Sequence, residues 1–424
     1  MSARSPVPAL GRVYGPKVID HPEKPLRIAI VAGEPSGDLL GAGLLRAIVR
    51  QWEQRSPGRQ SRIQIEGIGG PEMIAAGCHS LASMERLSVA GLSEVLARVP
   101  ELLLLRARLA KRFCGHPPDV FIGIDAPDFN LSLEKKLRQS GIPVVHYVSP
   151  TVWAWRGYRI KKIARAVDLM LTLFPFEEEI YTKNRMQAQF VGHPLADAIT
   201  DAPDKEKARR ALGLPSGGKI VALLPGSRLN EVKSMAPLML RTARWLTERQ
   251  PGIRFVVPLI NTVTRDYFQK ARAQEGRTKE GREIAITVLD KQARTAMAAA
   301  DAVLVTVGTA TLETLLMQRP MVITLRVSPL TYHIGKSLAT VDSIGLPNLL
   351  AGRPLVPELL QKDATPEKLG EAVLALLENP QAWTKMQTEF RKIGETLRKG
   401  ADESSAAAVL RLLDNIDYAK TKAR

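Results

Sequence analysis

The hydrophobic positions of the first half alternate between short β-branched runs and longer amphipathic segments, beginning at Leu26. The runs predict strands at 27–32, 62–66, 119–124, 143–148, 168–173 and 188–191. The amphipathic segments predict helices at 38–52, 131–140 and 157–166. Strands and helices that alternate at this spacing are typical of a parallel, doubly wound sheet.

The alternation pauses over a polar stretch at 200–218, which is predicted to be a linker region, and then starts again. Strands are predicted at 219–224, 253–257, 284–288, 302–307 and 321–325. We therefore expect an α/β protein with two Rossmann-like domains, 25–200 and 201–384, facing a cleft. Ligands of such sheets bind beyond the carboxyl ends of the strands. Residues 1–24 hold four prolines and no apolar block, so we expect a disordered extension.

Composition narrows the function classes. The 424 residues carry a formal net charge of +17, which favours partners such as anionic phospholipid, a phosphorylated substrate or RNA without choosing among them. Cys78 and Cys114 form no CxxC pair, and the six histidines show no metal-binding spacing, so we predict no metal site. No run of about 18 apolar residues exists to span a bilayer.

The turn after the first strand is rich in glycine and reads IVAGEPSGDLLGAG at 30–43. Exposed N–H groups at a helix start attract oxygen-rich ligands, and glycine lets the backbone approach them. The candidate ligand contacts are Gly33, Glu34, Ser36, Gly37 and Asp38. A tight turn with Asp38 as a helix cap explains the same residues equally well, although Glu34 at the strand end favours function.

Two aspartates follow the strand at 119–124, in the sequence GIDAPDFN. A carboxylate at a strand end suits a general base that removes a proton from a substrate hydroxyl. We predict the base role for Asp125 and a helix-capping role for Asp128.

The second half offers two further strand-to-helix turns. In LLPGSRLNE, the segment Gly226–Ser227–Arg228 brings small residues, a helix start and a guanidinium together, which predicts a diphosphate site. In VTVGTATLETLL, the small residues Gly308, Thr309 and Thr311 precede Glu313, which could accept hydrogen bonds from ribose hydroxyls. An ordinary first-turn acid that complements the helix dipole is the alternative for Glu313.

Three other segments have simpler alternatives. The segment 340–357 is predicted to be a functional loop with Asn348 and Arg353 as its polar candidates. Trp153, Trp155 and Tyr158 stand beside basic residues, but core packing explains them better than base stacking. The basic, leucine-rich segment 92–113 could lie in a membrane interface or pack in the core, and we expect Pro100 to break or kink it.

Taken together, these motifs closely resemble the lipid-A-disaccharide synthases, bacterial inverting glycosyltransferases of GT-B type. The resemblance covers about residues 27–410. It is carried, in the family's order, by AGEPSGDLLGAG, GIGGPEM, GIDAPDFN, HYVSPTVWAWR, VGHPLAD, LLPGSR, GTATLE and LPNLLAGR.

The resemblance implies a defined, metal-free and cofactor-free reaction. The donor would be UDP-2,3-diacylglucosamine, and the 6-hydroxyl of 2,3-diacylglucosamine 1-phosphate would displace UDP to form a β-1,6 disaccharide. Asp125 would be the base and Glu34 a nearby essential acid, while Arg228, Glu313 and Asn348 would belong to the donor site.

The resemblance also implies a place and an assembly. The chain would work in the cytoplasm on the anionic inner face of the bacterial inner membrane, with 92–113 as the membrane contact. Residues 385–424 would form a helical segment that packs back on the first domain or is exchanged in a homodimer. Two departures from the family's pattern stand out, Pro35 after Glu34 and Leu325 in the strand before Arg326.

Other functions remain as alternatives. A UDP-sugar epimerase or a peptidoglycan glycosyltransferase could share the fold, but GIDAPDFN and LPNLLAGR favour lipid A synthesis. An RNA-binding protein would bind in a salt-sensitive way through 153–165. We expect no nucleic-acid partner, because phosphate-binding turns in both halves would then have no purpose.

Overall fold

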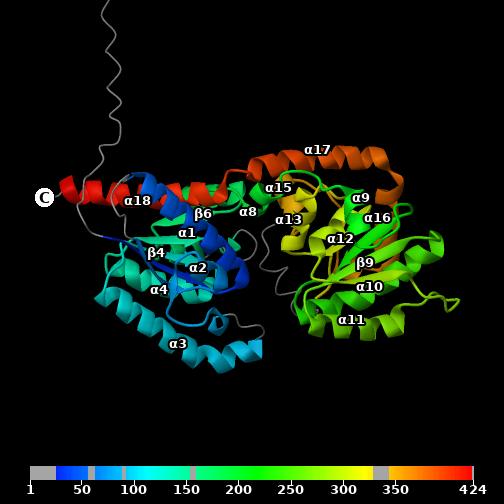
Figure 1. The fold of residues 1–424 in the computed structure, drawn as a ribbon, viewed down its shortest axis with the longest axis horizontal. Coiled ribbons are helices and arrows are strands. Elements are labelled where there is room, and N and C mark those ends of the chain that lie inside the picture. The colour runs from blue at the N-terminus through cyan, green and yellow to red at the C-terminus, as the bar shows by residue number, and fades with distance from the viewer. Residues whose placement is uncertain (1–24, 56–62, 88–91, 153–158, 328–342, 423–424) are drawn as a thin grey trace, which may run out of the picture.

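The computed structural model describes residues 25–55, 63–87, 92–152, 159–327 and 343–422, which form two α/β lobes side by side (Figure 1). The predictions for residues 1–24 and for Trp153, Trp155 and Tyr158 lie outside the described residues.

The first lobe is built on a seven-stranded parallel sheet of order β3-β2-β1-β4-β5-β6-β7. Its strands are β1 (Leu26–Ala32), β2 (Ile63–Ile68), β3 (His79–Ser80), β4 (Val120–Ile124), β5 (Val144–Tyr147), β6 (Leu169–Thr172) and β7 (Ala188–Phe190). Its helices are α1 (Pro35–Arg55), α2 (Pro71–Ala75), α3 (Leu92–Gly115), α4 (Pro127–Gln139), α6 (Ile160–Ala164), α7 (Pro175–Lys183) and α8 (Pro194–Ala198), with a 3-10 turn at Met84–Arg86.

The second lobe repeats the plan with a six-stranded parallel sheet of order β10-β9-β8-β11-β12-β13. Its strands are β8 (Ile220–Leu224), β9 (Arg254–Leu259), β10 (Ile286–Asp290), β11 (Ala302–Thr306), β12 (Met321–Leu325) and β13 (Glu358–Leu360). Its helices are α9 (Lys205–Ala211), α10 (Leu229–Arg249), α11 (Thr262–Glu275), α12 (Ala293–Ala299), α13 (Thr309–Leu316), α15 (Leu346–Ala351) and α16 (Pro366–Glu378), with a 3-10 turn at Gln361–Asp363. The predicted pair of doubly wound α/β domains is confirmed.

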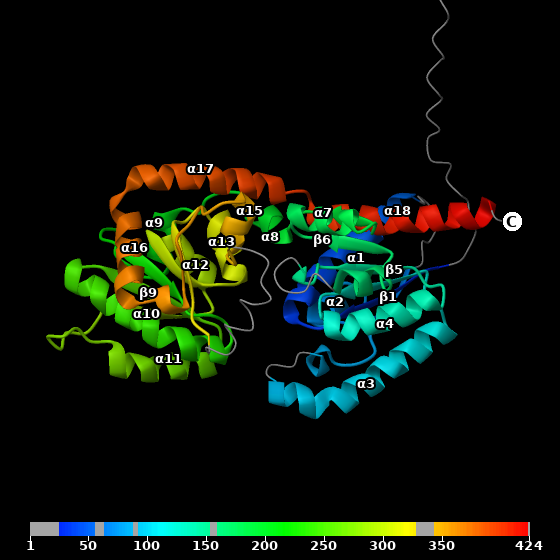
Figure 2. The same ribbon diagram turned by 180° about the vertical axis from the view of Figure 1, so that it is seen from behind.

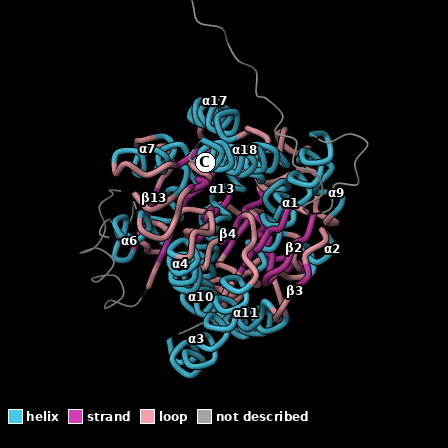
Figure 3. Tube along the Cα trace, turned by 90° about the vertical axis from the view of Figure 1, so that its left-hand side faces the viewer, coloured by secondary structure: helices cyan, strands magenta, loops and turns pink. Residues whose placement is uncertain are grey.

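Each sheet is covered on both faces, and its central strands β4, β8 and β11 are buried along their whole length. Successive residues of a strand point to opposite faces. In β1, Ile28 and Ile30 enter the core beneath α1, whereas Ala29 and Val31 enter the core beneath α3 and α4. Figure 3 views the molecule from the end, with strands lying between layers of helices. Such two-sided burial explains why the strands read as continuous apolar runs.

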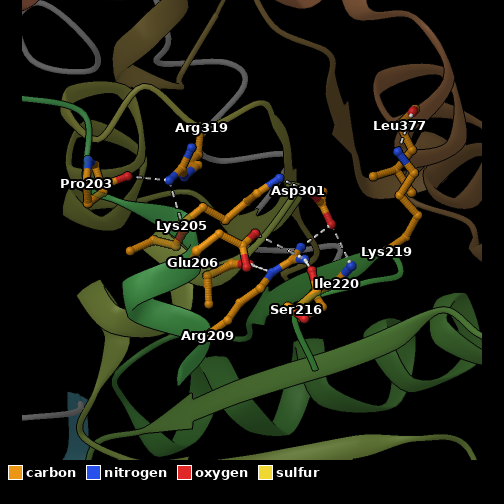
Figure 4. A network of polar contacts seen from close by, with 12 residues as sticks. Pro203, Lys205, Glu206, Arg209, Ser216, Lys219, Ile220, Asp301, Arg319 and Leu377 are labelled. Atoms are coloured by element: carbon orange, nitrogen blue, oxygen red, sulfur yellow. Dashed lines mark hydrogen bonds and ion pairs between the residues drawn. The ribbon is translucent and has the colours of Figure 1, made fainter. Parts of the chain in front are cut away.

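The segment 200–218, predicted to be a linker, contains a helix and belongs to the second lobe. Asp204 starts α9 by accepting a hydrogen bond from the Lys207 N–H at 3.0 Å. Arg209 is buried and pairs with Asp301 at 2.7 Å, and it donates to the carbonyl of Ser216 at 2.7 Å (Figure 4). This network fixes α9 to the second sheet, so the polar composition reflects surface exposure and one buried ion pair.

Three other local features differ from what the sequence pattern indicated. The segment 340–357, read as a loop, contains α15, and β13 was missed because three half-buried residues carry too little pattern. Helix α3 continues through Pro100, so the predicted break is absent, while the alternative of a kink stays a prediction.

Two C-terminal helices join the lobes. Helix α17 (Pro380–Leu397) lies along the second lobe, and α18 (Ala401–Lys422) returns to pack on α1, as Figures 1 and 2 show. Arg55 pairs with Asp414 at 3.1 Å across this contact. A side chain at Gly43 would overlap Asp402, so glycine permits the close approach of α18. The predicted boundary at 385 therefore falls inside α17, and exchange of this segment in a dimer stays a prediction.

Candidate active site

The candidate residues gather at the switch point of each sheet. In the first sheet, β1 has β2 on one side and β4 on the other, and in the second sheet β8 lies between β9 and β11. The loops that leave β1 and β4 carry Glu34 and Asp125, and the loops that leave β8 and β11 carry Arg228 and Gly308. Switch points are where doubly wound sheets bind ligands.

The two switch points approach each other across the lobes. Nη2 of Arg228 lies 3.8 Å from Oε2 of Glu34, a pairing that the local sequence pattern of neither lobe indicates. Both side chains are largely exposed, at 66% and 44%, so the ion pair itself adds little stability. Its significance is positional, because it brings the predicted acid and the predicted diphosphate contact together.

Asp125 occupies an unusual turn at the end of β4. Asp125 and Ala126 have φ values of 47° and 44°, a left-handed conformation that costs non-glycine residues roughly 1–3 kcal/mol each. The Asp125 N–H donates to the carbonyl of Tyr147 at 2.9 Å, and Nδ2 of Asn130 donates to the Asp125 carbonyl at 2.9 Å. A Cβ at Gly33 would lie 2.7 Å from that of Ala126. The turn is therefore held from three sides while Asp125 stays partly exposed.

The predicted capping role of Asp128 is wrong. The N-cap of α4 is Ala126, which makes no side-chain cap. Asp128 lies in the first turn, where its charge complements the helix dipole, and its 84% exposed side chain pairs with Arg159 at 3.2 Å.

The predicted ligand contact of Asp38 is also corrected, because its carboxylate is buried and engaged inside the protein. Oδ1 accepts hydrogen bonds from the N–H groups of Gly70 at 2.8 Å and Met73 at 3.0 Å. Oδ2 accepts one from the Glu72 N–H at 3.0 Å. Asp38 therefore caps α2, a neighbouring helix, and not the helix to which it belongs.

The remaining residues of this turn divide by exposure. Pro35, a departure from the expected pattern, is the first residue of α1, a position that proline favours. Ser36 is exposed at the helix start. Gly37 is buried, and a Cβ there would lie 3.4 Å from side chains of Ala32 and Ile124, so it serves packing.

In the predicted diphosphate turn, the N–H groups at the start of α10 are already bonded to a carboxylate of the protein, that of Glu231. Oε2 of Glu231 accepts hydrogen bonds from the N–H groups of Ser227 at 2.9 Å and Arg228 at 3.2 Å. Gly226 has φ of 116°, which glycine tolerates best. Sequence reasoning missed Glu231, although a glutamate three residues after a helix start is the spacing of a capping box.

The turn after β11 contains both exposed and buried residues. Gly308, with φ of 152°, and Thr309 are exposed at the start of α13. Thr311 is fully buried, and its hydroxyl donates to the Gly308 carbonyl at 2.8 Å, so it supports the turn. Glu313 accepts a hydrogen bond from Nε of Arg294 at 2.9 Å, a partner on α12 that the sequence did not reveal.

Asn348, which was predicted to contact the sugar donor, has its side chain buried inside the second lobe. It is 3% exposed, and its Oδ1 accepts from the N–H groups of Leu355 and Val356 at 2.8 and 2.9 Å. Its Nδ2 donates to Glu358 at 3.0 Å. Arg353 lies on the surface and pairs with Glu389 of α17 at 3.3 Å.

A cavity of about 420 Å³ lies elsewhere, at the amino-terminal ends of β1 and β2, and its lining includes Arg27, His79 and Arg112. This is the opposite end of the sheet from the switch point. Within the described ranges, no group of three or more His, Cys, Asp or Glu side chains is placed to hold a metal ion.

Two doubly wound domains whose switch points face each other define the GT-B architecture, which glycosyltransferases share with related nucleotide-sugar enzymes. Solved structures with this fold include the UDP-GlcNAc 2-epimerase from Neisseria meningitidis bound to UDP-GlcNAc, with a TM-score of 0.59. It is 13% identical and covers 91% of this chain and 99% of its own. The glycotransferase of kitacinnamycin has a TM-score of 0.58 at 16% identity, covering 92% and 99%.

Within that class, the family model described as lipid-A-disaccharide synthetase matches residues 28–412, and the chain belongs to this family of glycosyltransferases. A lipid-A-disaccharide synthase of Hahella chejuensis is 46% identical over 402 residues, covering 95% of this chain and 98% of its own. That of Methylobacillus flagellatus is 49% identical over 383 residues, covering 90% and 98%. That of Escherichia coli is 46% identical over 390 residues, covering 92% and 99%. The resemblance found in the motifs is confirmed.

Proposed function

We propose that this enzyme transfers 2,3-diacylglucosamine from its UDP derivative to the 6-hydroxyl of 2,3-diacylglucosamine 1-phosphate, with inversion at the anomeric carbon. Asp125 is the base. One observation carries the proposal: Asp125 is held in a left-handed turn at the switch point of the first lobe. At the same switch point, Glu34 is contacted by Arg228 of the second lobe.

The chemistry requires one displacement. The acceptor oxygen attacks the anomeric carbon, the bond from that carbon to the UDP oxygen breaks, and its electron pair leaves with UDP. The acceptor's proton goes to Asp125. A base acts late in such an attack, when the hydroxyl has become acidic, so the carboxylate needs a fixed position within hydrogen-bond reach.

The departing UDP gains negative charge, and the second lobe offers groups to stabilise it. Arg228 and the helix starts of α10 and α13 are exposed at the junction. Donors that are already oriented toward developing charge lower the barrier most. The N–H groups of Ser227 and Arg228 would exchange the Glu231 carboxylate for a diphosphate oxygen. Glu313, held by Arg294, is the proposed contact of the ribose hydroxyls.

The acylated substrates require contact with an anionic membrane surface, and α3 is the proposed contact. Leu105, Leu109 and Phe113 pack into the core, while Leu103 and Leu104 on the other side are 49% and 62% exposed. Exposed basic residues, Arg108 and Lys111, follow on the same helix. None of the helices in the described segments is long and apolar enough to span a bilayer. A homodimer remains part of the proposal.

The test is UDP release by the purified protein given both acylated sugars, with each sugar omitted in turn. Release that needs both, with a disaccharide phosphate as product, supports the proposal. Release from the donor alone would favour epimerase-type or hydrolytic chemistry.

The matched pair Asp125→Asn and Asp128→Asn tests the base. Both residues lie in one turn, and we expect the first substitution to reduce kcat by about 10²–10⁴-fold, the usual contribution of a general base. UDP binding should survive in both variants, and the second should keep its turnover because Asp128 is 84% exposed. Near-normal turnover of Asp125→Asn would remove the base role.

A further inference from the structure

A column of fully buried polar side chains lies between α4 and the strands that lead to Asp125. Asn130 and Glu134 stand one turn apart on α4, and His146 lies on β5 opposite Gly123 in the register of the sheet. All three side chains are 0% exposed. Buried polar groups are costly unless they are paired, so their presence in an otherwise apolar core needs a reason.

The first member of the column holds the turn directly. Nδ2 of Asn130 donates to the carbonyl of Asp125 at 2.9 Å and lies 3.3 Å from that of Ile124. One helical turn further, Oε1 of Glu134 lies 2.6 Å from Nδ1 of His146. A side chain at Gly123 would overlap Glu134, so glycine makes room for the pair beside the last residues of β4.

The pair joins a carboxyl group and an imidazole inside the core. Burial lowers the pKa of His146, but the Glu134 carboxylate, with a further contribution from Asp125, outweighs burial and raises the pKa above its usual value. The imidazolium form is therefore favoured. Among the described residues, Oε2 of Glu134 has no hydrogen-bond partner. A buried ion pair with an unpaired polar atom is a poor way to gain stability, because desolvation cancels much of the attraction.

We propose that Glu134 and His146 form a positioning pair, which holds the end of β4 against β5 and so fixes the left-handed turn that presents Asp125. This rests on the proposed role of Asp125 as the base. His146 reaches the turn through its own strand, since the next residue, Tyr147, accepts the hydrogen bond from the Asp125 N–H at 2.9 Å. Glu134 is linked to the turn through α4, because Asn130 of the same helix donates to the Asp125 carbonyl.

Three substitutions separate positioning from packing. His146→Leu removes the cation, His146→Asn keeps a donor near the place of Nδ1, and Glu134→Leu with His146→Leu replaces the pair by apolar groups. Replacing a buried ion pair by apolar residues is often neutral for stability, whereas removing one partner is not. Met170→Leu is the matched control, because Met170 is the register partner of His146 on β6, the neighbour of β5 away from β4.

We expect kcat of His146→Leu to fall on the order of 10²-fold, the effect of a displacement of about 1 Å at a reacting group, with KM and UDP binding unchanged. His146→Asn should recover much of kcat. The double variant should melt near the wild type yet keep a low kcat. Full turnover in the double variant, or unchanged kcat in His146→Leu, would overturn the proposal.

A second measurement does not depend on the reaction. Hydrogen exchange at the Asp125 amide, measured without substrates, should be faster in His146→Leu and in the double variant than in Met170→Leu. If the wild type released no UDP, the proposed function would fail while this readout still tested the pair. Unchanged exchange would show that the pair does not hold the turn.

Discussion

Asp38 offers a sharp test of the distinction between a ligand contact and a structural cap. Its substitution by alanine leaves three N–H groups without their carboxylate, and two of them, those of Gly70 and Met73, belong to buried residues. The third belongs to Glu72, which is exposed and can be solvated. The variant Asp38→Asn is the matched control, because Oδ1 alone accepts from both buried N–H groups.

The magnitude follows from the two buried donors. An unsatisfied buried donor costs about 1–3 kcal/mol, so Asp38→Ala should lower the stability of the first domain by about 2–6 kcal/mol. A loss of about 3 kcal/mol corresponds to roughly 6–12 °C in the melting temperature of a domain of this size. Asp38→Asn loses only the bond to the Glu72 N–H, about 1 kcal/mol.

Calorimetry measures both shifts, and hydrogen exchange over residues 67–75 locates them. UDP binding, measured by titration calorimetry, should be the same in both variants and the wild type. If Asp38→Ala melted normally but lost affinity for substrate, Asp38 would be a ligand contact and the capping argument would be wrong.

Three further predictions concern other parts of the chain. Burial lowers the pKa of His193 to about 4 despite the nearby Asp197, so the unfolded chain binds an extra proton between about pH 4 and 6.5. The contribution of neutral His193 to the free energy of unfolding is therefore fully present above about pH 6.5. It falls by up to about 3 kcal/mol as the pH drops to 4. His193→Asn keeps a cap acceptor for the Leu195 N–H and should flatten the pH dependence of unfolding; equal slopes in the two proteins would contradict this. Leu103→Ser with Leu104→Ser should weaken binding to anionic liposomes in a flotation assay, and reversing the charges of Arg108 and Lys111 should weaken it further, whereas unchanged flotation would exclude α3 as the contact. Glu231→Gln keeps an acceptor at the start of α10 but removes its charge, so UDP should bind several-fold more tightly by about 1 kcal/mol; weaker binding would show that Glu231 does not compete with the diphosphate.

Much of the architecture could be predicted because it rests on local patterns. Strands such as β1 and β8 are continuous apolar runs, and the glycine-rich turns that follow them recur at the same place in each half. The switch points follow from the strand order of a doubly wound sheet. The family followed from motifs such as GIDAPDFN, whose order along the chain is specific even though each one alone is weak.

The roles of individual polar residues could not be predicted in this way. Asp38 and Asn348 stand in motifs predicted to bind ligand, yet both are buried and hydrogen-bonded inside the protein. Glu34 and Asp125 remain partly exposed. The difference depends on which N–H groups from distant segments lie beside each side chain in the folded protein. Local sequence spacing does not indicate these contacts.

The sequence by itself determined the two doubly wound units, the positions of most of their strands and the family, because hydrophobic periodicity and turn composition act over a few residues. Only the tertiary structure decided that Arg228 meets Glu34, that α18 returns to the first lobe, and that Glu134 pairs with His146 beneath Asp125. These contacts join residues that are close only after the sheets have formed, since their pairing energies depend on burial and distance in the folded chain.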